Sequence, residues 1–155
     1  MLMRLLRAVR FRNDQAAQAL VEFALVLPLF LLLVTGILDV ARAVWQENTL
    51  AYAAREGTRY AIVHGASGVP IVGPCSVCLN PATNNLGNVT NAVIAGAVGV
   101  YNIDVTIDYP DAGNNRNQRV SVDATAPFTP LPSQYLLGGA FQITLRGGSM
   151  LVIQR

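Results

Sequence analysis

The sequence predicts an α+β protein, in which a long N-terminal helix crosses a membrane and a short helix and a three-stranded antiparallel sheet follow. Three observations predict this fold class. A run of apolar residues with a single acid starts near residue 18, helical spacing continues to about residue 64, and apolar and polar residues alternate after residue 100. The 155-residue chain is 52% hydrophobic and only 13% charged, which is more apolar than an ordinary soluble domain.

The first 17 residues form a short basic leader. They carry four arginines against one aspartate, a net charge of +3, whereas residues 18–155 carry seven arginines and eight acids, a net charge of −1. Arginines that precede a span stay in the cytoplasm, so we expect a cytoplasmic N-terminus and an extracytoplasmic C-terminal domain. Because the basic excess lies in the leader, the pI of about 8.8 gives no reason to expect binding to nucleic acid.

Residues 18–64 are predicted to form one helix, with the membrane-spanning part at about 20–40. At 1.5 Å per residue this helix would be roughly 70 Å long, and a bilayer needs only about 20 of its residues. The remainder is amphipathic and is expected to project from the membrane or pack on the exported domain. Pro28 removes the hydrogen bond to the carbonyl of Ala24, so it predicts a kink or a local opening of the helix.

Residues 65–155 are predicted to form the exported α+β domain, which begins with a loop rich in glycine and proline at 65–83. This loop contains Cys75 and Cys78, a CxxC pair. In an oxidising compartment a local disulfide is the simplest interpretation; a redox pair, a zinc site and free thiols are the alternatives. A zinc site would need two more ligands, and His64 is the sole histidine. We therefore expect neither a metal nor a cofactor.

A short helix is predicted after this loop, capped by Thr83 or Asn84 and ending near Gly99. Its buried face would consist of Leu86, Val89, Val93 and Ala97.

Three strands are predicted after the short helix. The first, 101–109, alternates without a break; the second has its inward positions at Val120, Val122 and Ala124. Pro127, Pro130 and Pro132 predict a loop before the third strand, which has Phe141, Ile143 and Leu145 on one face. After Gly147 and Gly148 the apolar positions shift to Met150 and Val152, which indicates a β-bulge.

Glu22 is the acid inside the apolar run, and an anion in hydrocarbon is costly and usually functional. One interpretation places it near the cytoplasmic headgroups, where it needs no partner. In the other, a cation offsets its charge. If a peptidase cuts between Ala17 and Gln18, the new α-amino group is such a cation, and a neighbouring chain staggered by about one turn could present it.

Asp39 and Arg42 are three residues apart and can pair on one helix face. Such a pair would end the span or contact another subunit. No catalytic set accompanies His64: the sequence has no GxSxG motif, and its glycine-rich stretches follow no phosphate-loop pattern. We therefore expect a protein that is not an enzyme.

The N-terminal motif resembles that of TadE-like pseudopilins of the tight-adherence (Flp-type) pilus system. The resemblance is carried by Ala17–Phe23 with the ALVLPLFLLLVTGILDVAR that follows it, by Ala53–Tyr60 and, more loosely, by the stretch from Val120 to Leu145. It implies a pilin-like fold. The expected partners are other pilin or pseudopilin subunits, a prepilin peptidase, a membrane assembly platform and membrane lipid.

The resemblance also implies that the peptidase removes the leader and leaves Gln18 as the first residue. Glu22 and Phe23 would then be the fifth and sixth residues of the mature chain and would serve assembly. Where such peptidases usually find glycine before the cut, this chain has Ala17.

Two other functions stay open at this point. The chain could be a signal-anchored surface or binding protein that assembles into nothing. It could also be a secreted protein, because Ala41–Ala43 forms an A-x-A-like site for a signal peptidase.

Overall fold

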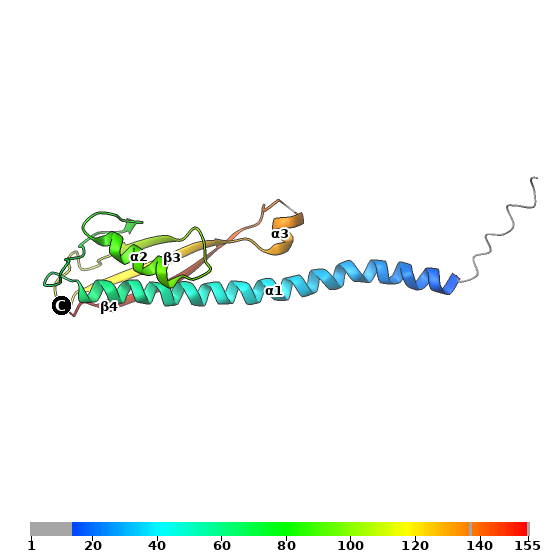
Figure 1. Cartoon of the computed structure of the whole chain (residues 1–155), viewed down its shortest axis with the longest axis horizontal. Coiled ribbons are helices and arrows are strands. Elements are labelled where there is room, and N and C mark those ends of the chain that lie inside the picture. Colours follow the sequence, from blue (N-terminus) through cyan, green and yellow to red (C-terminus); the bar gives the residue numbers. More distant parts are fainter. Residues whose placement is uncertain (1–13, 137, 155) are drawn as a thin grey trace, which may run out of the picture.

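The computed structural model describes residues 14–136 and 138–154, so the four arginines of the predicted leader lie outside the described residues. The predicted α+β class is confirmed: a long N-terminal apolar helix is followed by a short helix and an antiparallel sheet in a pilin-like arrangement (Figure 1). The sheet has four strands rather than three.

Helix α1, Asp14–Val63, is continuous for 50 residues and begins four residues before the predicted start. It passes through Pro28 without interruption. Its N-terminal half extends away from the rest of the molecule, and its C-terminal half lies along the sheet and the second helix (Figure 1). The described residues thus leave most apolar side chains of the first half exposed, while the alanine-rich second half forms one wall of the core.

The remaining elements follow in the order β1 (Cys78–Leu79), α2 (Leu86–Gly96), β2 (Asp104–Asp108), β3 (Arg119–Phe128), α3 (Leu131–Leu136) and β4 (Ile143–Val152). The strands lie in the order β1-β2-β3-β4, and all neighbouring pairs are antiparallel. Strand β1 lies within the predicted loop and pairs Cys78 with Ile107 and Leu79 with Thr106. Two residues are too few to show an alternating pattern, so periodicity does not reveal this strand.

The four residues predicted for the apolar face are all buried, so this face is confirmed, although α2 ends at Gly96 and Ala97 is its C-terminal capping residue. Its predicted cap is wrong. The capping position is Asn85, which has a left-handed backbone (φ 56°) and makes no side-chain hydrogen bond to the helix. The side-chain amide of Asn85 instead donates to the carbonyl of Ile71, 2.9 Å away, and so ties the start of α2 to the preceding loop.

Strand β2 is shorter than predicted at its N-terminal end. Asn102 has a left-handed backbone (φ 54°), which breaks the extended chain before the sheet begins. Tyr101 is consequently 81% exposed and does not join the buried face that Val105, Ile107 and Tyr109 form. Apolar and polar residues alternate through Asn102 although the strand begins only at Asp104, so the pattern places the start of β2 too early.

The predicted bulge in the last strand is wrong, because β3 and β4 pair residue for residue from Arg119–Val152 to Phe128–Ile143. Leu145 and Gly147 are buried on the same face, so the inward positions do not shift. Pro127 also lies inside β3, opposite Thr144, and the loop predicted from the prolines contains α3. The third strand's predicted apolar face is only partly buried, since Phe141 and Ile143 are exposed.

The core lies between the C-terminal half of α1, helix α2 and one face of the sheet. Small residues of α1 allow this close packing: a Cβ added at Gly57 would contact the side chain of Val93 and would lie 3.4 Å from that of Val122. Gly57 therefore stands in mid-helix for a packing reason that offsets its low helix propensity. The buried positions of α1 here are Leu50, Ala53, Ala54, Gly57, Thr58 and Ala61.

Tyr109 connects the sheet to the loop after α1. Its hydroxyl donates to the carbonyl of Val72 at 3.3 Å, and Asn114 donates to the same carbonyl at 3.1 Å. Burial raises the pKa of Tyr109 to about 12, from the usual 10.0.

The ionisation of Tyr109 predicts a loss of stability at alkaline pH. The folded state favours the neutral phenol, so this group has no effect on stability below pH 10, and stability falls as the pH rises from about 10 to about 12. Tyr109→Phe should flatten the fall in this window and cost only about 1 kcal/mol at neutral pH, because Val72 keeps the bond from Asn114. Urea unfolding of the full chain in detergent at a series of pH values measures this; equal slopes for both proteins would contradict it.

Candidate assembly site on the free half of the long helix

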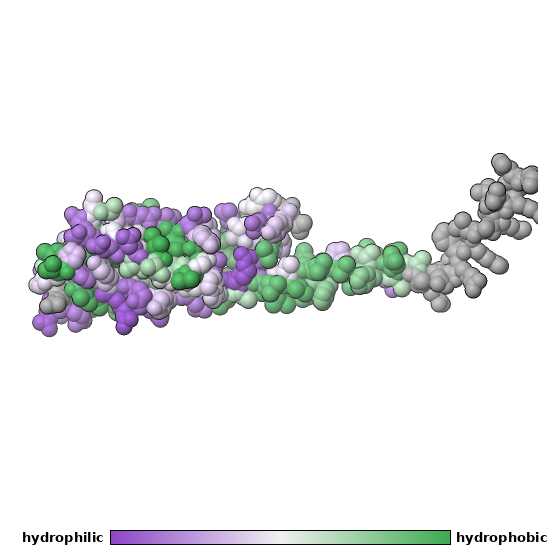
Figure 2. Space-filling model, viewed as in Figure 1, coloured by the Kyte–Doolittle hydropathy of each residue, from purple (hydrophilic) through white to green (hydrophobic). Residues whose placement is uncertain are grey.

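The N-terminal half of α1 presents an apolar surface on all sides. Its apolar segment is the one described helix long and apolar enough to cross a membrane, and none of that segment is buried against the rest of the chain. Figure 2 shows it as a hydrophobic rod that leaves a largely hydrophilic domain. Because no bilayer or partner covers these side chains in the isolated chain, their exposure to water would be unfavourable. The large exposed residues include Leu20, Val21, Phe23, Leu25, Val26, Leu29, Phe30, Leu31, Leu32 and Leu33.

Glu22 lies on this exposed surface and makes one hydrogen bond, to the side-chain amide of Gln18 at 3.0 Å. The two residues are one turn apart, so the amide and the carboxylate lie on the same face of α1. The amide is neutral, and among the described residues no arginine forms an ion pair with Glu22. Within the part of the chain that the structure describes, the charge of the carboxylate is therefore not offset.

The residues predicted for processing and assembly share one end of α1. Ala17 and Gln18 lie in its first two turns, and Phe23, next to Glu22, is exposed. A cut between Ala17 and Gln18 would remove the first turn of the helix and place a new α-amino group about one turn from Glu22.

The apolar segment contains two residues that affect its polar groups, Pro28 and Thr35. Pro28 lies inside α1 and leaves the carbonyl of Ala24 without its usual helix bond. The Thr35 hydroxyl donates to the carbonyl of Leu31 at 2.9 Å and lies 3.0 Å from that of Leu32, so it needs no partner outside the helix. The hydroxyl of Thr35 is thus satisfied within α1, as a polar group in hydrocarbon needs to be.

Asp39 ends the apolar segment and is 6% exposed. The predicted ion pair is present, with Arg42 Nη1 2.9 Å from Asp39 Oδ1. The other carboxylate oxygen accepts a bond from the backbone N–H of Leu131, at the start of α3, at 2.8 Å. The Arg42 guanidinium also lies 5.4 Å from the centre of the Phe128 ring. Asp39 therefore fastens α3 to α1, a role the sequence did not reveal because its partner is 92 residues away.

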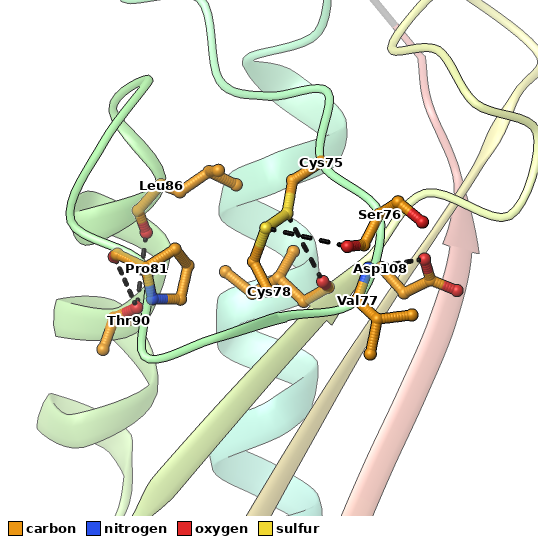
Figure 3. Close-up of a disulfide and its surroundings, with 9 residues drawn as sticks. Cys75, Ser76, Val77, Cys78, Pro81, Leu86, Thr90 and Asp108 are labelled. Atoms are coloured by element: carbon orange, nitrogen blue, oxygen red, sulfur yellow. Dashed lines mark hydrogen bonds between the residues drawn. A yellow bond between two sulfur atoms is a disulfide. The ribbon is translucent and has the colours of Figure 1, made fainter.

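The two cysteines lie at the other end of the domain, away from the free half of α1 (Figures 1 and 3). Their sulfurs are bonded to each other, and their Cα atoms are 6.2 Å apart. The short loop between them is held by the bond from the backbone N–H of Val77 to Asp108 at 3.1 Å, which Figure 3 shows. Within the described residues no group of three or more histidine, cysteine, aspartate or glutamate side chains lies close enough to hold a metal ion.

Removal of the disulfide between Cys75 and Cys78 is expected to lower the stability of the domain only modestly. A loop this short lowers the entropy of the unfolded chain little, so the disulfide should contribute about 2 kcal/mol. The variant with Cys75→Ser and Cys78→Ser should therefore remain folded, with a lower urea midpoint. An alkylating reagent should label native material only after reduction. Labelling of two thiols without reductant would show that the bond is absent in the native protein.

Comparison with known proteins finds a similarity in α1. Residues 17–59 match the family model described as TadE-like protein. No curated protein and no solved structure matches the chain. The match begins at Ala17, includes Glu22, Pro28 and Asp39, and ends within the part of α1 that packs on the sheet. Residues 17–59 of this chain thus form a TadE-like family domain.

Proposed function

We propose that this protein is a minor pilin-like subunit of a tight-adherence pilus or of its assembly machinery, and that it serves as a structural subunit rather than as an enzyme. The observation that carries the proposal is the combination of the TadE-like domain with a helix whose apolar segment is not buried by the described residues of its own chain. In a pilus system such a helix has two environments, the membrane before assembly and a bundle of neighbouring helices after it. Both cover apolar side chains that α1 leaves bare.

The proposed topology is a single span. Residues of α1 from about 20 to about 40 cross the cytoplasmic membrane, the basic leader stays in the cytoplasm, and residues 65–155 form the extracytoplasmic domain. The four arginines before the span support this orientation. The disulfide at Cys75 and Cys78 suits an oxidising compartment outside the cytoplasm.

Glu22 and the new N-terminus are proposed to set the register of assembly. Prepilin peptidase cuts between Ala17 and Gln18, and the freed α-amino group of one subunit neutralises Glu22 of its neighbour. Among the described residues 14–136 and 138–154, the one hydrogen-bond partner of Glu22 is the neutral amide of Gln18, which does not offset its charge. Because a carboxylate in apolar surroundings is stable only when a cation offsets it, subunits would pack best where the two groups meet.

N-terminal sequencing of the native protein tests the processing step. We expect the mature chain to start at Gln18 in cells that contain a prepilin peptidase and to keep its leader in cells that lack the enzyme. An intact leader in both strains would overturn the proposed processing. A soluble protein that starts at Val44 would instead establish secretion, and a membrane protein that copurifies with no pilus component would favour a signal-anchored surface protein.

A further inference from the structure

We propose that the α3 hairpin, defined as residues 130–136 and 138–142, inserts into the extracytoplasmic leaflet beside α1 and forms a second contact with the membrane. The groove between α3 and α1 would then hold a phospholipid acyl chain. This inference rests on the proposed function in one respect, namely the assignment of the free half of α1 as a membrane span.

The position of the groove along α1 is the first argument. A groove of about 380 Å³ separates the two helices; its lining residues are Pro28, Leu31, Leu32 and Thr35 of α1 with Leu131, Pro132 and Tyr135 of α3. At 1.5 Å per residue, the stretch from Pro28 to Thr35 lies about 6 to 16 Å on the N-terminal side of Asp39. Figures 1 and 2 show α3 beside the start of the bare apolar rod. If that rod lies in hydrocarbon, α3 lies next to hydrocarbon as well.

The length of the apolar segment is the second argument. Seventeen residue steps separate Glu22 from Asp39, which gives about 25 Å of helix, whereas the hydrocarbon core of a bilayer is about 30 Å thick. With Glu22 near the cytoplasmic headgroups before assembly, the outer membrane boundary is therefore expected to lie beyond Asp39. Asp39 can be tolerated there because it is buried, paired with Arg42 and bonded to the N–H of Leu131.

The composition of the hairpin is the third argument. Residues 129–142 contain no charged side chain. Tyr135 is 77% exposed and Phe141 is also exposed, although both are large and aromatic. Tyrosine and tryptophan are enriched where proteins meet the membrane surface, and Trp45 of α1, about two turns beyond Asp39, is exposed too. These three aromatic side chains would form a belt at the outer boundary.

The hydrogen bonds of the hairpin are the fourth argument, since backbone groups that enter a bilayer need partners within the protein. The buried Ser133 supplies several. Its hydroxyl donates to the carbonyl of Phe141 and accepts from the N–H of Phe141, both at 2.9 Å, and its carbonyl accepts from the N–H of Gly139 at 2.9 Å. The N–H of Gln134 donates to the carbonyl of Pro130. These four bonds satisfy part of the hairpin's backbone from within the protein and so lower the cost of placing it in a membrane.

Lipid fits the groove better than a protein segment does for a chemical reason. The lining is apolar except for two hydroxyls. That of Thr35 already donates within α1, and that of Tyr135 belongs to a side chain whose usual place is the membrane surface, where headgroups and water can bond it. The groove is also continuous with the surface of the span, which the bilayer would already cover. An acyl chain can enter it without any polar group losing a bond.

Tryptophan fluorescence can test this, because Trp45 is the sole tryptophan of the chain. The full-length protein carries Trp45→Phe together with one of three changes: Tyr135→Trp in α3, Phe30→Trp in the span, or Tyr52→Trp on the exposed side of α1 well outside the membrane. Each protein is reconstituted into vesicles of equal parts phosphatidylcholine and phosphatidylglycerol, with and without bromine on the acyl chains. Bromine quenches an indole that lies in the leaflet.

We expect the Tyr135→Trp protein to be quenched nearly as strongly as the Phe30→Trp protein and several-fold more than the Tyr52→Trp protein. Strong quenching of the Phe30→Trp protein with weak quenching of the Tyr135→Trp protein would overturn the hairpin proposal and leave the span intact. Weak quenching of the Phe30→Trp protein would overturn both. Quenching of the Tyr135→Trp protein that disappears as the protein-to-lipid ratio rises would show that a second copy occupies the groove, which also overturns it.

Discussion

The variant Gly147→Val is expected to unfold the C-terminal domain or to lower its stability by at least about 3 kcal/mol. Gly147 lies in β4 opposite Ala124 and faces α1. A Cβ at this position would collide with the backbone of Leu50 and Ala51, and the Cα of Ala51 would be only 2.6 Å away. Backbone atoms in a helix cannot move aside as a side chain can, so α1 would have to separate from the sheet. Urea unfolding and resistance to protease, both on the full chain in detergent, measure the effect.

Gly148→Val is the matched control for this prediction. Gly148 is the next residue of the same strand, it is exposed, and its added Cβ would meet only the flexible carboxylate of Asp123. The cost should be limited to the exposed ion pair between Asp123 and Arg146, less than about 1 kcal/mol. If both variants lost the same stability, the close approach of β4 to α1 would not be the reason for the glycine.

The second large effect is expected for Glu22→Leu. The variant should insert into the membrane as well as the native chain, because leucine matches the surrounding apolar surface. It should nevertheless fail to enter filaments. Removing one partner of a buried ion pair typically costs 3–5 kcal/mol, which corresponds to a fall of about a hundredfold or more in the equilibrium constant for the contact. Immunoblots of sheared surface filaments and of the membrane fraction measure the two outcomes separately.

Glu47→Leu serves as the control, since Glu47 is an exposed acid of the same helix beyond the apolar segment. It should leave incorporation unchanged. Normal filament content of the Glu22→Leu protein would count against the proposed pairing, and an equal loss in both variants would point to a general effect of removing acids from α1.

The parts of the fold that local patterns encode were predictable. The apolar run of α1, the buried face of α2 and the inward positions of β3 are each repeated along one element, so neighbouring residues reveal them. The β-bulge, by contrast, was wrongly inferred from Gly147 and Gly148. Gly147 is required by the approach of a helix about a hundred residues earlier in the chain, and a single sequence does not show that contact.

The candidate site likewise combines residues that the sequence reveals with contacts that only the fold creates. Glu22 and Pro28 were recognisable from the sequence because a charge or a proline in an apolar run is conspicuous, whereas Phe23 was named only through the family resemblance. The bond from Leu131 to Asp39 and the position of α3 beside the apolar segment were not, because they depend on how β3 and β4 place residues 129–142. The second membrane contact proposed above comes entirely from that placement.

The central claim is that the free half of α1 assembles against other subunits, and crosslinking in the cell tests it most directly. A photo-crosslinking amino acid replaces Phe30, which is exposed on the apolar segment, or Val69, which is exposed in the loop at the far end of the domain. The account predicts that the Phe30 position forms a covalent adduct with another pilus subunit and that the adduct disappears in cells without the pilus genes. Adducts with lipid alone, at the same yield in both strains, would contradict it.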